Sequence, residues 1–383
     1  MSDYLRLFTL FFYLGCISFG GPTAHLALFQ KELIDKRGWM STTAYMQLVA
    51  LCQILPGPTS SQVGMALGYH CTGYSGAFFA WLGFTLPAAL LLASIGIGIT
   101  QHDAWLNTTL LHGLSLAVVA IVAHALVTMI RQICVSHWHY LIMILVTVLS
   151  LFTLTPQIIL IILAALLGII FFRQQNYAVN LNFRFISPRV AALCLLAFFM
   201  LLFLLPYWIN TQSLVALFHH FYQAGALVFG GGHVVLPLLE AELSHGVWLT
   251  QEQFVAGYGI VQAMPGPLFN FASYLGALAY QQQPILGAVV AVIGIFLPAA
   301  LILFAALAAV HYINQFNYLK SAFTGIAAGV TGMLLATLYH PLITQAIISV
   351  EDVAIVIAGF LLLYFQKIPV YLLVVLCALF AWF

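Results

Sequence analysis

The sequence repeats itself at an offset of about 210 residues. Short motifs with unusual glycine and proline content recur in the same order in both halves. The matched pairs are FGGP at 19–22 with FGGG at 229–232, PGP at 56–58 with PGP at 265–267, and LPAAL at 86–90 with LPAAL at 297–301. The register drifts by only a few residues over a whole half, so the chain contains one duplicated unit. Any fold for this chain has to accommodate two similar halves.

Lipid is the expected surrounding of both halves. The chain has 383 residues, of which 64% are hydrophobic and only 5% are charged. A soluble domain carries about 25% charged residues, and so few charges cannot cover a water-facing surface of this size. The sequence therefore predicts an all-α polytopic membrane protein in contact with membrane lipid. A net charge of +1 argues against nucleic acid as a partner.

Several activities lack their sequence signatures. The six cysteines form no CxxC pair, which indicates neither a zinc site nor a disulfide framework, and we expect no metal or other cofactor. The chain contains no GxxxxGK[ST], HExxH or GxSxG motif, so neither an ATP-driven pump nor a familiar hydrolase is indicated. The first residues lack a signal-peptide pattern, and we expect them to belong to the mature fold.

The halves are expected to be inverted relative to each other. An apolar segment at 190–208 has no partner in the first half, so we predict a first repeat at 1–188, a linker with an extra spanning helix at 189–213 and a second repeat at 214–383. One extra crossing turns the second copy over, as in the inverted repeats of secondary transporters. Basic and acidic residues also exchange places between the copies: the first has Lys31, Lys36 and Arg37 where the second has acids.

One topology places every lysine and arginine in the cytoplasm. It requires re-entrant hairpins at 5–34, 43–70, 214–243 and 253–280. The remaining spans are expected near 76–99, 104–130, 138–154, 157–172, 284–308, 322–340, 352–366 and 369–383. Hairpins that cross the membrane fully are the alternative.

The Pro-Gly-Pro motifs predict broken helices at membrane depth. Proline removes a backbone donor and clashes with the preceding turn, and such breaks are tolerated only where protein or a water-filled cavity satisfies the backbone. The helix that follows Pro58 begins with Thr59 and two serines, which makes an N-terminus suited to an anion. The alternative is that glycine and proline merely kink the helices or permit close packing. Recurrence of the breaks in both halves favours a binding site.

The candidate site residues lie at these breaks. The predicted substrate-binding residues are Gly20, Gly21, His25, Gln53, Gly57, Thr59, Ser60, Ser61 and Gln62 in the first copy, and Gly231, Gly232, His233, Gln262, Gly266, Asn270 and Ser273 in the second. Glu32 and Glu242 occupy equivalent positions and are candidate coupling or gate carboxylates. For both carboxylates an interfacial helix-end charge is the alternative, and for either histidine a packing role is equally open.

The motifs resemble those of the chromate ion transporter family. FGGPTAHLALFQKEL and LVALCQILPGPTSSQVGMALGY resemble its first domain, and FGGGHVVLPLLEAEL and FVAGYGIVQAMPGPLFNFASYLGALA resemble its second. The resemblance covers both halves. It implies a multi-pass protein of the bacterial inner membrane that exports chromate from the cytoplasm with the proton motive force.

Three functions follow as hypotheses. The first is an alternating-access transporter of chromate, or of sulfate or another tetrahedral oxyanion, with the anion held between the two broken-helix pairs. The second is an uncoupled anion channel of the same architecture. The third, an intramembrane enzyme, lacks any motif. A monomer and a homodimer both remain open.

Overall fold

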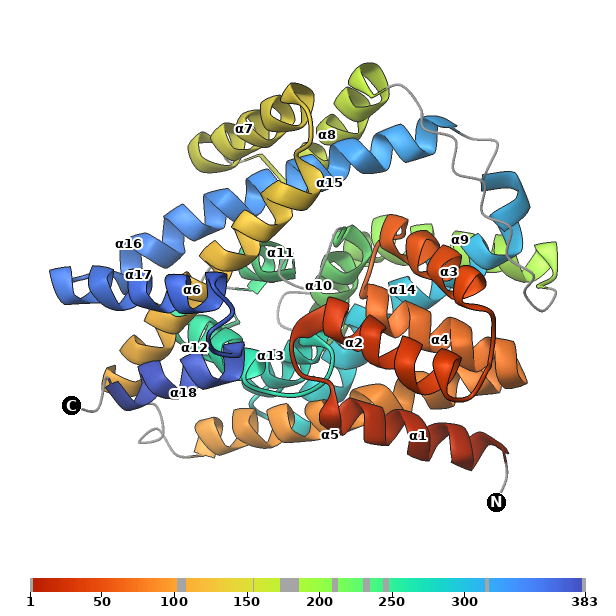
Figure 1. Ribbon diagram of the computed structural model, residues 1–383, viewed down its shortest axis with the longest axis horizontal. Helices are drawn as coiled ribbons and strands as arrows, with labels where there is room; N and C mark the ends of the chain where they lie inside the picture. Colours follow the sequence, from red (N-terminus) through yellow and green to blue (C-terminus); the bar gives the residue numbers. More distant parts are fainter. Residues whose placement is uncertain are drawn as a thin grey trace. The chain divides into compact units, whose positions relative to one another are not determined.

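The computed structural model describes residues 3–101, 108–153, 155–172, 186–208, 213–229, 235–243, 248–313 and 317–380. Within these ranges the chain is helical and contains no strand (Figure 1). Five helices in the described part are long and apolar enough to cross a membrane. The expected all-α polytopic membrane class is confirmed.

The helix bounds follow the expected apolar segments closely. In the first half they are α1 (Asp3–Ile17), α2 (Gly21–Phe29), the π-helix η1 (Gln30–Asp35), α3 (Thr42–Ile54), α4 (Thr59–Thr72), α5 (Tyr74–Gln101), α6 (Thr108–Ile133), α7 (His137–Phe152) and α8 (Gln157–Phe171). The linker helix is α9 (Pro188–Phe203), followed by the 3-10 turn η3 (Leu205–Trp208). In the second half they are α10 (Leu214–Leu227), α11 (Val235–Leu243), α12 (Gln251–Gln262), the 3-10 turn η5 (Leu268–Asn270), α13 (Phe271–Ala279), α14 (Pro284–Ile313), α15 (Asn317–Thr337), the π-helix η6 (Leu338–Ile343), α16 (Thr344–Ala346), α17 (Val350–Tyr364) and α18 (Val370–Phe380).

The described helices form two compact units, and each unit takes segments from both halves of the sequence. Unit 1 contains residues 1–97, 175–232 and 265–317, and unit 2 contains residues 98–174, 233–264 and 318–383. The compact units therefore divide the chain differently from the sequence repeat. The repeat boundaries at 188 and 214 stay a prediction.

Within unit 1, equivalent helices of the two copies pack through equivalent glycines. Gly15 of α1 lies so close to α5 that a Cβ atom on it would be 2.7 Å from the carbonyl oxygen of Phe84. Gly225 of α10 touches the carbonyl of Ile295 on α14 in the same way. Small residues allow helix backbones to approach this closely in membranes. The matched contacts agree with a duplicated unit, and the inversion of one copy stays a prediction.

The core of unit 1 supports the C-terminal end of α2. Phe29 packs edge-on against Phe11 and Phe84, with ring centroids 5.7 and 5.0 Å away. All three rings are buried. Edge-on aromatic packing adds to the stability that burial provides. It fixes α2 between α1 and α5, which places the residues after the first glycine break.

Candidate functional site

Both Pro-Gly-Pro motifs break the helix, and each break is held by the other copy. In the first copy α3 ends at Ile54 and α4 begins at Thr59, and the Gly57 N–H donates to the carbonyl oxygen of Val228 at 2.8 Å. In the second copy the Gly266 N–H donates to the carbonyl oxygen of Ser18 at 2.7 Å. Ser18 and Val228 each directly precede the Phe-Gly-Gly motif of their copy. Each Pro-Gly-Pro break is thus bonded to the residue that precedes the Phe-Gly-Gly motif of the opposite copy, and we call these two contacts within unit 1 the exchanged pairs.

Glycine is required at the centre of both motifs. Gly57 has φ = 110° and Gly266 has φ = 96°, a region that residues with a Cβ atom rarely adopt. A Cβ atom on Gly57 would lie 2.5 Å from Cβ of Ala299, and one on Gly266 would lie 3.1 Å from Cβ of Ala88. The two alanines belong to the repeated LPAAL motif, on α14 and α5. A side chain at either glycine would therefore meet the opposite copy before it could meet a ligand.

Two amide side chains fasten the broken segments to the opposite copy. Gln62 Nε2 donates to the carbonyl oxygens of Pro56 at 2.8 Å and Ala299 at 3.3 Å. Asn270 Nδ2 donates to the carbonyl oxygen of Thr85 at 3.0 Å. Because carbonyls only accept, these contacts fix which atom of each amide is the nitrogen. Nearby, the Ser273 hydroxyl donates to the carbonyl oxygen of Ala89 at 2.7 Å.

His25 joins the two exchanged pairs. Its fully buried ring lies between the carbonyl oxygen of Ser18, 3.2 Å from Nε2, and the hydroxyl of Ser60, 3.3 Å from Nδ1. A carbonyl cannot donate, so Nε2 carries the hydrogen and the Ser60 hydroxyl donates to Nδ1 of the neutral ring. His25 therefore contacts the first turn of α4 and also the carbonyl that holds Gly266.

Among the described residues, four buried polar atoms at the breaks have no hydrogen-bond partner. They are Ser61 Oγ, Gln62 Oε1, Thr85 Oγ1 and Asn270 Oδ1. Their side chains are at most 3% exposed. Each unsatisfied group of this kind costs free energy in a low-dielectric interior, which indicates a place for a polar ligand or water. The N-cap residue of α4, Pro58, makes no side-chain cap, so the first N–H groups of α4, in the same turn as Ser61 and Gln62, have no intrahelical acceptor.

The other predicted site residues do not join this group of buried polar atoms. Gly20 and Gly21 open α2 with positive φ, Thr59 is half-buried, and Gln53 is exposed on α3. Gln262 and Glu242 are half-buried in unit 2, so they are not among the residues that unit 1 brings together. Gly231, Gly232 and His233 lie outside the described residues.

Glu32 lies on the π-helix η1, in an ion-paired cluster. Its carboxylate accepts from Lys36 Nζ at 2.6 Å and from Arg37 Nη1 at 3.2 Å. The hydrogen bond from Lys36, with that from Arg37, lowers the pKa of the Glu32 carboxyl below its ordinary value. The contacts favour the charged form of this residue.

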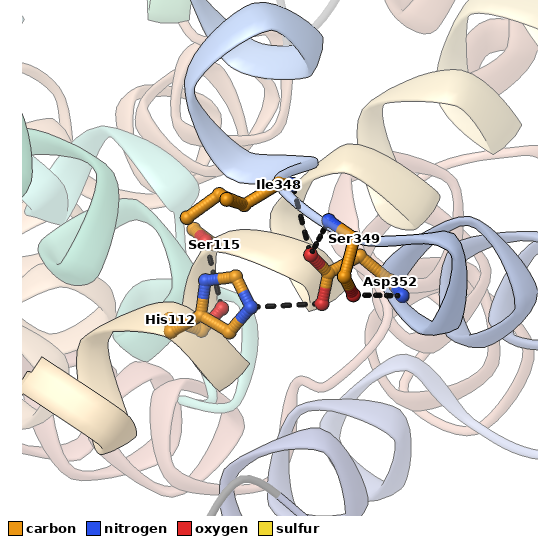
Figure 2. Close-up of polar contacts among 5 residues, drawn as sticks. All are labelled: His112, Ser115, Ile348, Ser349 and Asp352. Carbon is orange, nitrogen blue, oxygen red and sulfur yellow. Dashed lines mark hydrogen bonds and ion pairs between the residues drawn. The ribbon is translucent and has the colours of Figure 1, made fainter.

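Sequence reasoning missed a polar pair in unit 2. Figure 2 shows His112 of α6 facing Asp352 of α17, with His112 Nε2 at 2.8 Å from Asp352 Oδ1. The other carboxylate oxygen accepts from the N–H groups of Ile348 at 2.9 Å and Ser349 at 2.8 Å. His112 also lines a cavity of about 430 Å³ together with Glu252. The two partners are 240 positions apart and lie in no motif, so no local signal could have joined them.

The larger cavity of unit 1 has a different character. A groove of about 780 Å³ runs between α5, α13 and α14 and is lined mostly by apolar side chains, among them Phe78, Leu90 and Val289. Thr85 and Ser273 are among its few polar residues. Such a lining solvates an oxyanion poorly, so the broken helices are the better candidate for an anion.

The fold and the site define a class of protein. Apolar spanning helices, paired helix breaks and buried polar groups at those breaks are typical of secondary transporters. The chain belongs to the chromate transporter family, whose model matches residues 5–169 and 215–382. Members of this family are membrane transporters, and the present chain is accordingly a multi-pass membrane protein.

Known relatives resemble nearly the whole chain. It is 28% identical to the chromate transport protein of Pseudomonas aeruginosa over 88% of this chain and 80% of that protein. It is 26% identical to the chromate transport protein of Cupriavidus metallidurans over 95% of this chain and 88% of that protein. It is also 26% identical to an uncharacterized transporter of Methanocaldococcus jannaschii, over 94% and 89% of the two chains. No solved structure matches the chain.

Proposed function

We propose that the protein is a secondary transporter that exports chromate from the cytoplasm by alternating access, driven by the proton motive force. Its family and its relatives in Pseudomonas and Cupriavidus support chromate as substrate. The observation that carries the proposed site is the group of unpartnered buried polar atoms at the exchanged helix breaks of unit 1.

The first turn of α4 supplies the donors for the anion. The N–H groups of Thr59, Ser60 and Ser61 point out of the helix end, and the helix dipole adds a partial positive charge there. The Ser61 hydroxyl, 1% exposed and unpartnered, adds a further donor. Among the described residues, no lysine or arginine forms a hydrogen bond or ion pair with the first turn of α4, so dipoles and hydroxyls would neutralise the anion.

The unpartnered amide oxygens of Gln62 and Asn270 could accept hydrogen bonds from water molecules bound to the anion. Within the described part of the chain, Gln62 Oε1 and Asn270 Oδ1 have no hydrogen-bond partner, while their amide nitrogens donate to carbonyls of the opposite copy. An oxyanion offers no donor, whereas a water molecule can donate to the amide oxygen and to the oxyanion at once. The site would thus hold a partly hydrated anion.

Movement of the exchanged breaks would give access to each side in turn. Each break is anchored to the opposite copy by one backbone hydrogen bond and one amide side chain. Only these few hydrogen bonds would have to break and re-form when a break moves. Glu32 and Glu242 are the proposed gate carboxylates at the ends of the two hairpins. Glu32 would act as an ion-paired latch with Lys36 and Arg37.

Transport of chromate into inside-out proteoliposomes tests the function. The vesicles receive an imposed pH gradient and, separately, an imposed potential, with sulfate as competitor. We expect accumulation driven by at least one gradient, and a loss of about tenfold in rate for Ser61→Ala, the effect of one hydrogen bond to a charged group. Ser94→Ala is the matched control, because the Ser94 hydroxyl donates to the carbonyl oxygen of Leu90 on the exposed part of α5.

The outcomes separate the hypotheses. Passive equilibration of chromate without accumulation would indicate an anion channel of the same architecture. Accumulation that Ser61→Ala leaves unchanged would remove the helix-break site while retaining the transporter. Absence of any chromate or sulfate flux would contradict the proposed substrate class.

A further inference from the structure

We infer that His25 links proton binding to oxyanion binding by reversing its hydrogen bond with Ser60. This inference rests on the proposed function and assigns His25 a role different from that of an anion ligand. The ring is fully buried, and both of its nitrogens are engaged by protein atoms, the Ser18 carbonyl oxygen and the Ser60 hydroxyl. It therefore acts on the anion through Ser60, as a positioning residue.

The hydrogen positions in the neutral state follow from the acceptors. The Ser18 carbonyl already accepts from the Gly266 N–H at 2.7 Å, and it also accepts from His25 Nε2 at 3.2 Å. Nδ1 of the same ring then has a lone pair and accepts from the Ser60 hydroxyl at 3.3 Å. In this state the Ser60 hydrogen is directed at His25 and is withheld from any anion at the first turn of α4.

A proton on Nδ1 reverses this bond. Nδ1–H then donates to Ser60 Oγ, and the Ser60 hydrogen has to turn away from the ring because the two hydrogens would otherwise collide. Ser60 stands beside Ser61 in the first turn of α4, where the proposed anion binds. The only hydrogen bond that breaks in this step is the one from the Ser60 hydroxyl to Nδ1 of His25. One proton enters, and the site gains one hydroxyl donor and one positive charge.

Few other charges can compensate the imidazolium. The ring's remaining described contact is the edge-on ring of Phe84, with centroids 5.4 Å apart. The titratable groups on the elements packed against α2 are Asp3, Tyr4, Arg6, Tyr13 and Cys16 on α1, Lys31, Glu32 and Asp35 on η1, Tyr69, His70 and Cys71 on α4, Tyr45 and Cys52 on α3, and Tyr74 on α5. No ion pair joins His25 to any of these among the described residues. A bound oxyanion is therefore the natural counter-charge, and by linkage each ligand favours the other.

At the positions that the repeat offset pairs with His25 and Ser60, the second copy has no equivalent of this pair. The repeat offset places Val235 opposite His25 and Phe269 opposite Ser60, and both of these side chains are buried and apolar. The backbone clamps at Gly57 and Gly266, by contrast, occur in both copies. The His25–Ser60 bond is thus an addition to the duplicated scaffold and not a requirement of its packing.

Anion affinity of the purified protein as a function of pH tests the inference. The stabilisation of the protein by chromate and by sulfate against thermal unfolding is measured from about pH 4 to mildly alkaline pH, because burial of the His25 ring disfavours its charged form. The wild-type protein is expected to bind the anion about tenfold more weakly at alkaline pH, the effect of losing one hydrogen bond to a charged group. His25→Gln keeps one donor and one acceptor but cannot take a proton, and its affinity is expected to change less than about twofold over the same range.

A second variant, Ser60→Ala, tests the same bond independently in case His25→Gln does not fold. Ser60→Ala removes a single oxygen and is expected to abolish the pH dependence of anion affinity, while the imidazole signals of His25 still titrate in the nuclear magnetic resonance spectrum. His124→Gln is the matched control on α6 in unit 2, and it is expected to keep the wild-type pH dependence.

Each outcome has a distinct meaning. A pH dependence that survives in both His25→Gln and Ser60→Ala overturns the inference and leaves the proposed oxyanion site in place. Loss of pH dependence in His124→Gln as well would also overturn it, since the effect would not be specific to the helix break. A wild-type protein that binds neither chromate nor sulfate at any pH would contradict the proposed function and this inference together.

Discussion

Replacing Gly57 by alanine should destabilise the protein more than the equivalent change at Gly266. Both glycines have positive φ, and an alanine forced into this region costs about 1–2 kcal/mol. At Gly57 the new Cβ atom would also lie 2.5 Å from Cβ of Ala299, and overpacking of this kind costs about 1–3 kcal/mol. At Gly266 the distance to Cβ of Ala88 is 3.1 Å, so little overpacking is added. The expected losses are about 2–5 and about 1–2 kcal/mol.

The clash with Ala299 can be separated from backbone strain by a double-mutant cycle. Ala299→Gly alone should cost about 1 kcal/mol, because glycine is less favourable than alanine inside a helix. In combination with Gly57→Ala it removes the opposing methyl group and should restore about 1–3 kcal/mol. The matched cycle of Gly266→Ala with Ala88→Gly should show a smaller coupling. Alanine is chosen at Gly57 because a larger side chain would disturb the packing against Ala299 before it could affect an anion.

A thiol-reactive fluorescent dye can follow unfolding in detergent. Cys52, Cys134 and Cys377 are buried and become reactive as the helices separate. Melting temperatures at a fixed scan rate then rank the variants. Equal losses at Gly57 and Gly266, or a double variant no more stable than Gly57→Ala, would refute the packing of the exchanged breaks described above.

Three further predictions follow from single contacts. Asn270→Leu should leave the Thr85 carbonyl without its donor and lower both the melting temperature and chromate transport; unchanged transport would separate this clamp from function. Glu32→Gln should leave the pH profile of transport unchanged around neutral pH, because the hydrogen bond from Lys36 lowers the pKa of the Glu32 carboxyl. Any stability from this ion pair is lost only as the pH falls through that lowered pKa. A flattened pH profile would instead make Glu32 a proton carrier. Asp352→Asn should lower the free energy of unfolding by about 1–3 kcal/mol, since one amide oxygen cannot replace two carboxylate oxygens. The control Glu351→Gln changes an exposed residue and should leave the stability unchanged. Equal effects of the two substitutions would show that the bonds of Asp352 to His112 and the backbone add no stability.

The sequence predicted local features well because each one has a local physical cause. Apolar runs such as that of α5 are long enough to span a membrane, and Pro-Gly-Pro cannot continue a helix. The breaks therefore fall where proline and glycine put them. The polar character of the first turn of α4 also followed directly from Thr59, Ser60 and Ser61.

The partners of these features could not be predicted, because they come from distant parts of the chain. Nothing near Gly57 indicates that its N–H would donate to Val228, or that the Gln62 amide would reach Ala299. The same applies to His112 and Asp352 in unit 2. The repeat suggested two similar halves, whereas the compact units take segments from both. A repeat in sequence fixes which elements resemble each other and leaves open which elements pack together.

The difference between the two copies predicts a coupling stoichiometry. Both copies clamp their glycine breaks through the same backbone bonds, so the scaffold is close to symmetric in its contacts. Among the described residues, a titratable ring bonded to the first turn of the helix after the Pro-Gly-Pro motif occurs in the first copy alone, since Val235 and Phe269 stand at the equivalent positions of the second. One proton should therefore accompany each oxyanion, which can be measured from the imposed potential and pH gradient at which net chromate flux in proteoliposomes vanishes. A ratio of two would require a second titratable group, and it would exclude His25 as the sole site of coupling.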